Sequence, residues 1–258
     1  MNNNPIGVFD SGIGGLTVLS AIRDLLPNEK LIYLGDGENC PYGSRPKEEI
    51  MGLVFAAVDH LLGMGCKMVV LACNTATAVA IEALRDKYPE TPFVGMEPAI
   101  KPACLTTKSG VVGVIATRRS LEGGLYRSTV AKYGSNIEII EDSARGFVEL
   151  VEGDNEDAEE ARSVVWAAIS KMVKAGADEI VLGCTHFPFL LSTIRSLAPD
   201  TTIIDPAPAV ARRVQSLLEQ RDICSSSPEG GDTIFATFGQ ESYLERLKQK
   251  AKRYNSKL

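Results

Sequence analysis

A repeated alternation of short apolar runs with longer amphipathic stretches constrains the fold most. Such alternation predicts parallel sheets covered by helices on both faces, the doubly wound class of α/β proteins. The apolar runs predict strands at Ile6–Phe9, Lys30–Leu34, Met68–Ala72, Phe93–Gly95, Val111–Ile115, Ile137–Ile140, Ile180–Leu182, Thr202–Ile204 and Thr233–Ala236. The other stretches predict helices at Gly15–Leu26, Pro46–Met64, Thr77–Lys87, Pro98–Thr106, Thr117–Tyr133, Ala158–Ala175, Phe187–Leu197 and Ala207–Gln220, with a last helix from Glu241.

An internal repeat divides the chain into two similar halves. VVLACNTAT, starting at Val69, matches IVLGCTHFP, starting at Ile180, and GVFDSGIGG from Gly7 corresponds to GVIATRRSL from Gly113. We therefore expect one α/β domain formed by residues 1–96 and 207–258, and a second formed by residues 97–206. Because ligands of open parallel sheets bind at the carboxyl ends of the strands, two such halves facing each other predict a site in the cleft between them.

Charge and composition restrict the class of partner. The formal net charge of −6 argues against a nucleic acid or an anionic membrane, so a small molecule is expected. The amino-terminal residues lack the pattern of a secretion signal, and no apolar run is long enough to cross a membrane. These features predict a cytoplasmic protein whose six cysteines remain thiols.

Two of the cysteines occupy equivalent places in the repeat. Cys73 and Cys184 each follow an apolar run and precede a polar turn, which places them near the start of the next helix. Helix amino termini lower the pKa of a thiol, although a small residue also simply fits a crowded strand end. The repetition favours chemistry. Packing roles are expected for Cys66, Cys104 and Cys224, and Cys40, beside Pro-Tyr-Gly, is left undecided.

His186 stands two residues after Cys184, where its imidazole is able to hold a thiolate or relay a proton. A structural zinc site needs four ligands, and no second Cys/His pair with suitable spacing exists, so no metal is predicted. A cysteine hydrolase using Cys184 and His186 is an alternative, but side chains two residues apart on a turn are expected to point in different directions. The other histidine, His60, lies in an amphipathic stretch and is assigned no role.

Two glycine-containing segments complete the set of candidate site residues. FDSGIGG places Asp10 and Ser11 at the end of the first strand, but it lacks the third Gly or Ala of a dinucleotide-binding loop and no Walker lysine follows. Taken alone it is also a tight turn capped by Asp10. The segment GDGENCPYGS, residues 35–44, predicts a rigid loop that carries Tyr42.

Together these motifs resemble those of glutamate racemases, in the aspartate/glutamate racemase family, over essentially the whole chain. The matching segments are Val8–Gly12 through Gly15, Gly35–Asp36 with Pro41–Gly43, Ala72–Ala76 and Gly183–Pro188. The resemblance implies a cofactor-independent isomerase that interconverts L- and D-glutamate. No lysine motif signals a pyridoxal cofactor, which agrees with that expectation.

The resemblance also implies roles for individual residues. Cys73 and Cys184 would be acid–base catalysts on opposite faces of the substrate, with Asp10 as the partner of Cys73, and with His186 and Glu152 as partners of Cys184. Contacts to glutamate would come from Asp10, Ser11, Tyr42, Gly43, Asn74, Thr75, Thr117, Thr185 and His186. One departure is Gly37–Glu38–Asn39, where many relatives have Thr or Ser, then Ala and Arg.

The resemblance further implies that the product D-glutamate feeds peptidoglycan synthesis and that the enzyme is a homodimer. Aspartate racemase is the nearest alternative, because the length of the pocket separates the two substrates. A non-catalytic amino-acid-binding module is a third reading, against which the paired cysteines argue.

Overall fold

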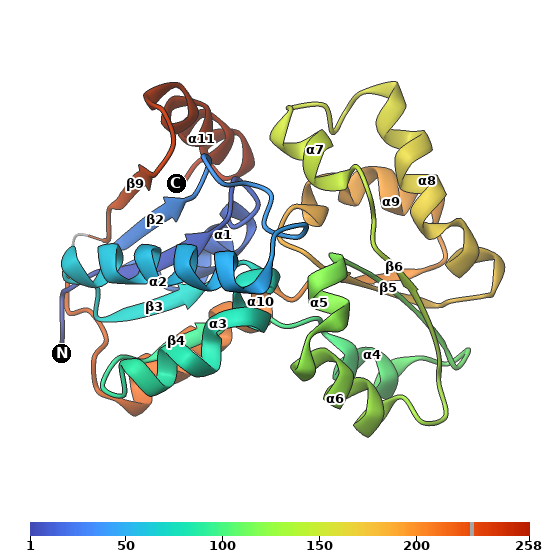
Figure 1. Cartoon of the computed structure of the whole chain (residues 1–258), viewed down its shortest axis with the longest axis horizontal. Helices are drawn as coiled ribbons and strands as arrows, with labels where there is room; N and C mark the ends of the chain where they lie inside the picture. The colour runs from blue at the N-terminus through green and yellow to red at the C-terminus, as the bar shows by residue number, and fades with distance from the viewer. Residues whose placement is uncertain (228–229) are drawn as a thin grey trace. The chain divides into compact units, whose positions relative to one another are not determined.

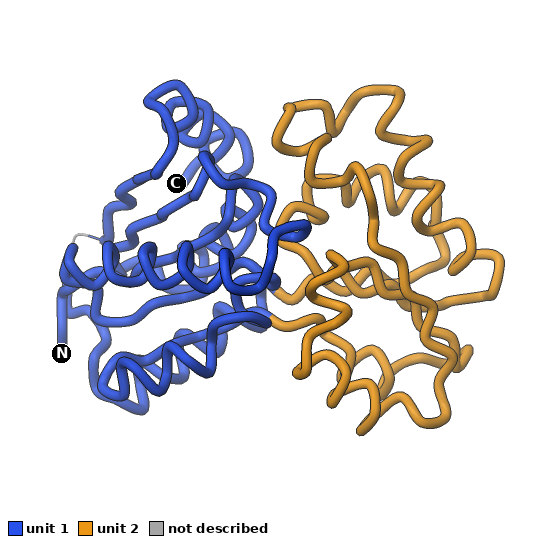
Figure 2. The backbone as a smooth tube through the Cα atoms, viewed as in Figure 1, with its two compact units in different colours: residues 1–96, 207–258 blue, residues 97–206 orange. Residues whose placement is uncertain are grey.

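The computed structural model describes residues 1–227 and 230–258. The chain forms two compact units, shown in different colours in Figure 2. Unit 1 contains Met1–Met96 and Ala207–Leu258, and unit 2 contains Glu97–Pro206. The chain therefore leaves unit 1, builds unit 2 without interruption, and then returns to unit 1.

Unit 1 is built on a sheet whose described strands are all parallel, in the order β4-β3-β1-β2-β9. These strands are β1 (Ile6–Asp10), β2 (Leu31–Gly35), β3 (Met68–Leu71), β4 (Phe93–Gly95) and β9 (Thr233–Thr237). The helices are α1 (Leu16–Leu25), α2 (Lys47–Gly63), α3 (Asn74–Lys87), α10 (Ala207–Gln220) and α11 (Glu241–Tyr254). Helices α2 and α3 pack together on one face of the sheet, and α1 packs with α10 on the other (Figure 1).

Unit 2 has a second parallel sheet, in the order β6-β5-β7-β8. Its strands are β5 (Val111–Ala116), β6 (Glu138–Asp142), β7 (Glu179–Gly183) and β8 (Thr202–Ile204). Its helices are α4 (Ile100–Thr106), α5 (Arg118–Glu122), α6 (Gly124–Tyr133), α7 (Phe147–Glu152), α8 (Glu159–Lys174), the short 3₁₀ helix η1 (Phe187–Leu190) and α9 (Leu191–Leu197). Alternate strand residues fill different cores: Ile115 and Leu182 pack with α8, whereas Val114 and Val181 pack with α4.

The two sheets repeat one topology. Strands β1 to β4 pair with one another in the same pattern as β5 to β8, and β9 adds one strand beside β2. In each sheet the first and third strands are neighbours, and the helices that follow them cover opposite faces. Between these two strands the direction in which the chain adds strands to the sheet reverses, and we call this place the reversal point of the sheet. The reversal leaves a crevice at the carboxyl ends of the two strands, where open α/β sheets bind ligands. The predicted parallel α/β class is confirmed.

Strand register brings the sequence motifs together at each reversal point. Phe9 pairs with Leu71, so the residues that follow β1 and β3 emerge side by side, and Ala116 pairs with Gly183 in the same way. Gly183 is required at its position because a Cβ there would lie 2.5 Å from the Cβ of Ala116. The absence of a side chain lets β5 and β7 end in close contact.

Two helix predictions need correction, and one helix was not predicted. The stretch 117–133 is not one helix, because Gly123 adopts an extended conformation (φ −64°, ψ 140°) between α5 and α6. The stretch 187–197 begins as the 3₁₀ helix η1, which has Pro188 in its first turn, before α9 starts. Helix α7 was not predicted, and it carries Glu152 as its last residue.

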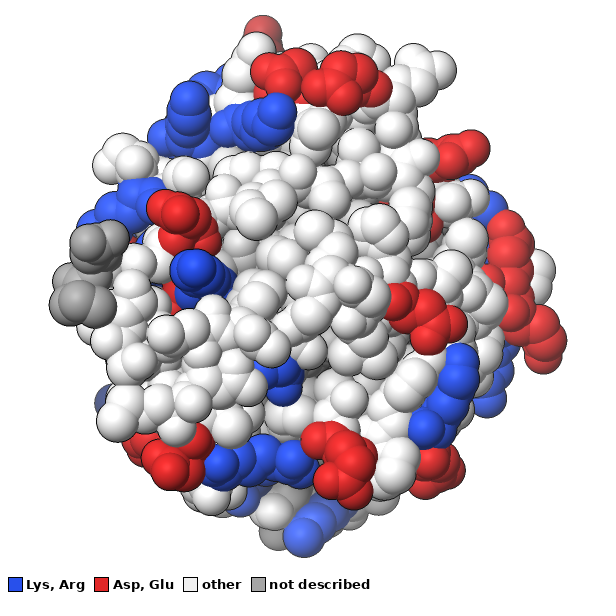
Figure 3. Space-filling view, turned by 90° about the vertical axis from the view of Figure 1, so that its left-hand side faces the viewer, with Lys and Arg blue, Asp and Glu red and all other residues white. Residues whose placement is uncertain are grey.

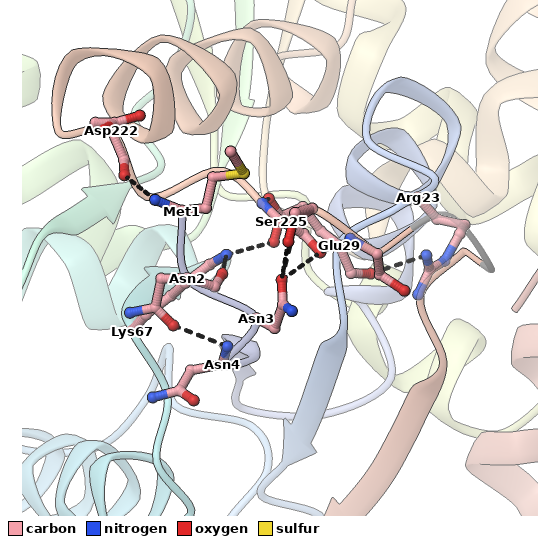
Figure 4. A network of polar contacts seen from close by, with 11 residues as sticks. Met1, Asn2, Asn3, Asn4, Arg23, Glu29, Lys67, Asp222 and Ser225 are labelled. Carbon is pink, nitrogen blue, oxygen red and sulfur yellow. Dashed lines mark hydrogen bonds and ion pairs between the residues drawn. The ribbon is translucent and has the colours of Figure 1, made fainter.

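A buried polar network joins distant segments at the amino-terminal edge of the unit 1 sheet (Figure 4). Lys67 Nζ lies 2.6 Å from Glu29 Oε2 and also donates to the carbonyl of Asn2. The other carboxylate oxygen of Glu29 accepts the main-chain N–H of Ser225 at 2.7 Å. Arg23 donates to the carbonyls of Glu29 and Asp232, and so ties the β9 segment to the same corner.

The surface shows no segregation of charge on the face that Figure 3 presents. Acidic and basic side chains alternate around its rim, and uncharged side chains cover its centre. Mixed charge of this kind does not produce the basic field that attracts a polyanion. Among the described residues, no helix combines the length and apolar character needed to span a membrane.

Replacing Lys67 with Met is expected to lower the free energy of unfolding by about 3–5 kcal/mol, because it leaves the charge of Glu29 buried without its partner. Urea denaturation followed by circular dichroism measures the change. Arg85→Met removes the solvent-exposed pair with Glu82 and is expected to cost less than about 1 kcal/mol. Equal effects of the two variants would contradict a special role for the buried pair.

Candidate active site

Cys73 occupies the reversal point of the unit 1 sheet. It is the N-cap of α3, and its Sγ accepts the main-chain N–H of Ala76 at 3.4 Å. The same Sγ lies 3.6 Å from Oγ of Ser11, which follows the neighbouring strand β1. A thiolate here would benefit from the partial positive charge at the start of α3 as well as from these two polar groups. The predicted position near a helix start is confirmed.

Asp10 ends β1 and is fully buried. Its Oδ1 accepts the N–H of Gly12 at 3.0 Å, which forms a tight turn and holds the carboxylate in place. Gly15 makes the approach of α1 to this turn possible, because a Cβ at that position would lie 2.5 Å from the Cβ of Asp10. The glycines of FDSGIGG thus shape a turn around a carboxylate.

Tyr42 reaches the same region from the loop after β2. Its hydroxyl donates to Asp36 Oδ2 at 2.6 Å, and its ring packs against Phe9. Burial raises the pKa of Tyr42 above its usual range, and the hydrogen bond to Asp36 and the negative charges of Asp36, Cys73 and Asp10 raise it further. The phenol therefore stays protonated beside this concentration of negative charge.

Asn74, the first residue of α3, is only 3% exposed. Among the described residues, neither its amide nitrogen nor its amide oxygen finds a hydrogen-bond partner. Because a buried polar group without a partner costs free energy, this amide is well suited to a ligand that supplies the missing hydrogen bonds. Thr75 is buried beside it in the chain.

Cys184 occupies the equivalent reversal point of the unit 2 sheet, directly after β7. Its Sγ lies 3.7 Å from Nδ1 of His186, and Nε2 of His186 lies 2.7 Å from Glu152 Oε1. The expectation that the side chains of Cys184 and His186 point in different directions is therefore wrong. The turn into the four-residue η1 helix brings both side chains to the same side.

The two cysteines therefore have different partners. Cys73 caps a 14-residue α-helix, whereas Cys184 is followed by a short 3₁₀ turn and depends on the His186–Glu152 pair. A helix terminus provides a fixed field, whereas an imidazole held by a carboxylate can also accept or release a proton. Both settings suit a cysteine that alternates between thiol and thiolate.

The remaining predicted contacts lie at the same strand ends. Thr117 follows β5 and caps α5, where its Oγ1 accepts the N–H of Ser120 at 3.3 Å. Thr185 is buried directly after Cys184, and Gly43 follows Tyr42 in the loop after β2. Unit 1 thus brings together Asp10, Ser11, Tyr42, Cys73 and Asn74, and unit 2 brings together Glu152, Cys184 and His186.

The cysteines expected to serve packing differ from these two. Cys66 is buried, and burial raises the pKa of its thiol to about 12, which keeps it protonated and unreactive at neutral pH. Burial also raises the pKa of Cys104. His60 is exposed on α2 and meets the ring of Phe238 edge-on.

Comparison with known proteins identifies the family of this chain. A family model described as Asp/Glu/Hydantoin racemase matches residues 14–214. The chain belongs to this racemase family. Members of the family are isomerases, so the chain is an isomerase.

Relatives within the family are similar over nearly the whole chain. The glutamate racemase of Herpetosiphon aurantiacus is 42% identical over 96% of this chain and 98% of its own length. The crystal structure of a glutamate racemase isoform from Bacillus anthracis has a TM-score of 0.86 at 32% identity, and covers 99% of this chain and 95% of its own. That of the Francisella tularensis glutamate racemase, in complex with D-glutamate, has a TM-score of 0.85 at 27% identity and covers 98% and 95%.

Asp36 is a site residue for which the sequence alone predicts no role. The residue lies within the matching Gly35–Asp36 segment, but nothing in the sequence shows that its carboxylate holds Tyr42. The sequence does show that Asp36 directly follows a buried strand and lies six residues before Tyr42. These two features place a polar residue at the carboxyl end of a strand, but they do not identify its hydrogen-bond partner.

Tyr42→Phe is expected to reduce the loss of stability at alkaline pH. Because folding raises the pKa of Tyr42, its contribution to stability is complete below the unfolded-state pKa of about 10 and is lost as pH rises through the higher folded-state pKa. Chemical denaturation between pH 9 and about 11 measures the difference. The free energy of unfolding of the unchanged protein should fall more steeply than that of Tyr42→Phe, by up to about 1.4 kcal/mol per pH unit. An identical dependence of the free energy of unfolding on pH in the two proteins would contradict a raised pKa of Tyr42.

Proposed function

We propose that this chain is a glutamate racemase that needs no cofactor and moves the α-proton of glutamate between Cys73 and Cys184. The observation that carries the proposal is the repeated topology. Each cysteine stands at the reversal point of its own parallel sheet, and each has its own polar partners there. A racemase needs two proton-transfer groups of similar strength, and a duplicated sheet supplies two equivalent positions.

The chemistry requires one thiolate and one thiol at the start of each turnover. The thiolate removes the α-proton, which is very weakly acidic, and the thiol donates its proton to the opposite face of the resulting carbanion. In the reverse direction the two cysteines exchange roles. The protein lowers the barrier by orienting the reacting groups and by hydrogen bonds that stabilise the developing negative charge.

The proposed partners differ between the two cysteines. Ser11 and the N–H of Ala76 support the Cys73 thiolate, and Asp10 is the last residue of the adjacent strand β1. His186, oriented by Glu152, supports the Cys184 thiolate. Each partner is placed to ease the gain and loss of the thiol proton.

Glutamate would be held by polar groups at the strand ends. The unsatisfied amide of Asn74 is a strong candidate for an α-carboxylate or ammonium contact, with Ser11, Thr75, Thr117 and Thr185 providing hydroxyl groups. Tyr42 and Gly43 would complete the contacts from the loop after β2. The bound D-glutamate of the Francisella relative supports this choice of ligand.

A cysteine hydrolase is the functional alternative that the geometry of unit 2 alone favours, because Cys184, His186 and Glu152 form a nucleophile–base–acid sequence. Membership of a racemase family, together with the equivalent position of Cys73, favours proton transfer instead. Aspartate racemase stays as the alternative within the same chemistry. We also propose, from the resemblance, that the enzyme acts as a cytoplasmic homodimer and supplies D-glutamate for peptidoglycan.

The two-base mechanism predicts that Cys73→Ser and Cys184→Ser each lower the rate of racemisation by at least about a thousandfold, because a serine hydroxyl is a far weaker acid than a thiol. Protein treated with a chelator is incubated with L-glutamate or L-aspartate in deuterated water. Loss of optical rotation and incorporation of deuterium at the α-carbon report the reaction for each amino acid.

Cys224→Ser, outside both sets of strand ends, is the matched control and should retain full turnover. Near-full turnover by either Cys73→Ser or Cys184→Ser would refute the two-cysteine assignment. Faster exchange of aspartate than of glutamate would support the alternative substrate. Dependence on added pyridoxal phosphate or metal would refute the cofactor-independent mechanism.

A further inference from the structure

The loop after β2 begins with a fully buried acidic residue. We call residues 36–45 the substrate loop, because it carries Tyr42 and Gly43. Asp36 is 0% exposed, and its main-chain N–H donates to the carbonyl of Asp10 at 3.0 Å. The start of the substrate loop is thereby fixed to the end of β1, next to the candidate catalytic residues.

The Asp36 carboxylate accepts hydrogen bonds from two other residues of the loop. It accepts the hydroxyl of Tyr42 at 2.6 Å, the side-chain amide of Asn39 at 3.0 and 3.1 Å, and the main-chain N–H of Asn39 at 3.3 Å. Arg45 then closes the loop, because its Nε donates to the carbonyl of Asn39 at 2.7 Å and its main-chain N–H to that of Tyr42 at 3.1 Å. The Asp36 carboxylate therefore holds Asn39 and Tyr42, and the carbonyls of these same two residues hold Arg45 at the end of the loop.

These contacts limit what Tyr42 and Gly43 can offer a substrate. The single hydroxyl proton of Tyr42 is donated to Asp36, and its ring is buried against Phe9. Gly43 has no side chain. The donors that this part of the loop can present to a carboxylate are therefore its main-chain N–H groups, whose direction depends on how the loop is held.

We propose that Asp36 is the positioning residue of the substrate loop, which it anchors through Tyr42 and Asn39 so that the main chain at Tyr42 and Gly43 is oriented to bind a carboxylate of the substrate. The proposal rests on the proposed function of this site. Asp36 has no proton to transfer in this role, and its effect is on the binding of both enantiomers.

The anchor includes a feature of this particular chain. Asn39 is the last residue of the segment Gly37–Glu38–Asn39, which follows Asp36 directly. Its amide donates to both oxygens of Asp36, so a short neutral side chain holds the middle of the loop against its first residue. Gly37 allows the loop to lie against α11, because a Cβ there would lie 2.4 Å from the ring of Tyr243.

The test compares Asp36→Asn with Tyr42→Phe and Asn39→Ala. An amide at position 36 still accepts one hydrogen bond but turns its NH₂ group toward donors, which loosens the loop. We expect Asp36→Asn to raise KM on the order of tenfold in both directions, with kcat changed less than about threefold, which is the pattern of lost uniform binding. Tyr42→Phe and Asn39→Ala should raise KM in the same way by smaller factors.

Glu38→Gln is the matched control, because it makes the same carboxylate-to-amide change at an exposed position of the same loop. It should leave KM and kcat unchanged. A fall in kcat with unchanged KM in Asp36→Asn would overturn the proposal, since it would place Asp36 in proton transfer. A normal KM in both Tyr42→Phe and Asn39→Ala would also overturn it, because the anchor would then not act through those residues.

A spectroscopic titration tests the anchor without turnover. Burial raises the pKa of Tyr42 most, and the hydrogen bond to Asp36 and its charge raise it further. Subtracting the phenolate absorbance of Tyr42→Phe, made with and without Asp36→Asn, isolates this tyrosine, which should ionise at lower pH when position 36 is Asn. An unchanged titration would overturn the anchor. Failure of the unchanged protein to bind or racemise glutamate would instead refute the proposed function, and the titration would still decide the anchor.

Discussion

The reversal of strand order between neighbouring parallel strands is the constraint on which the rest of the molecule depends. Because the helices after β1 and β3 cover opposite faces of the sheet, their first turns diverge and leave the carboxyl ends of both strands accessible. Ser11 and Cys73 meet at this place in unit 1, and Thr117 and Cys184 occupy the same place in unit 2. The polar groups of the site are thus consequences of how each sheet is wound.

The equivalence of the two positions does not extend to their electrostatics. In unit 1, buried Asp10 and Asp36 concentrate negative charge close to Tyr42, and hydrogen bonds from main-chain N–H groups offset part of it. In unit 2, the partner of the cysteine is an imidazole that already contacts a carboxylate. The two copies of the backbone therefore surround their cysteines with different polar groups. In the proposed mechanism, both sulfur atoms must change their protonation state easily.

The sequence was sufficient to predict every strand of the described sheets. The inner strands appear as continuous apolar runs because they are buried on both faces, and the more exposed outer strands β6, β8 and β9 still contain short apolar runs. It failed where a local residue overrode the periodic pattern. Gly123 interrupts an amphipathic stretch that otherwise continues to Tyr133, and short α7 buries only Phe147, Leu150 and Val151. The convergence of Cys184 with His186 depends on the 3₁₀ geometry that follows. The anchor at Asp36 depends on loop closure, which has no periodic signature.

The discontinuity of unit 1 has a consequence for the order in which the protein is made. Unit 2 is continuous, so all of its strands have been synthesised once residue 204 is complete. The sheet of unit 1 acquires its outer strand β9 only when residues 233–237 emerge, and the buried carboxylate of Glu29 gains its bond from Ser225 at nearly the same time. On the ribosome, unit 2 is therefore able to fold first, whereas unit 1 cannot complete its sheet until strand β9, within residues 207–258, has been made.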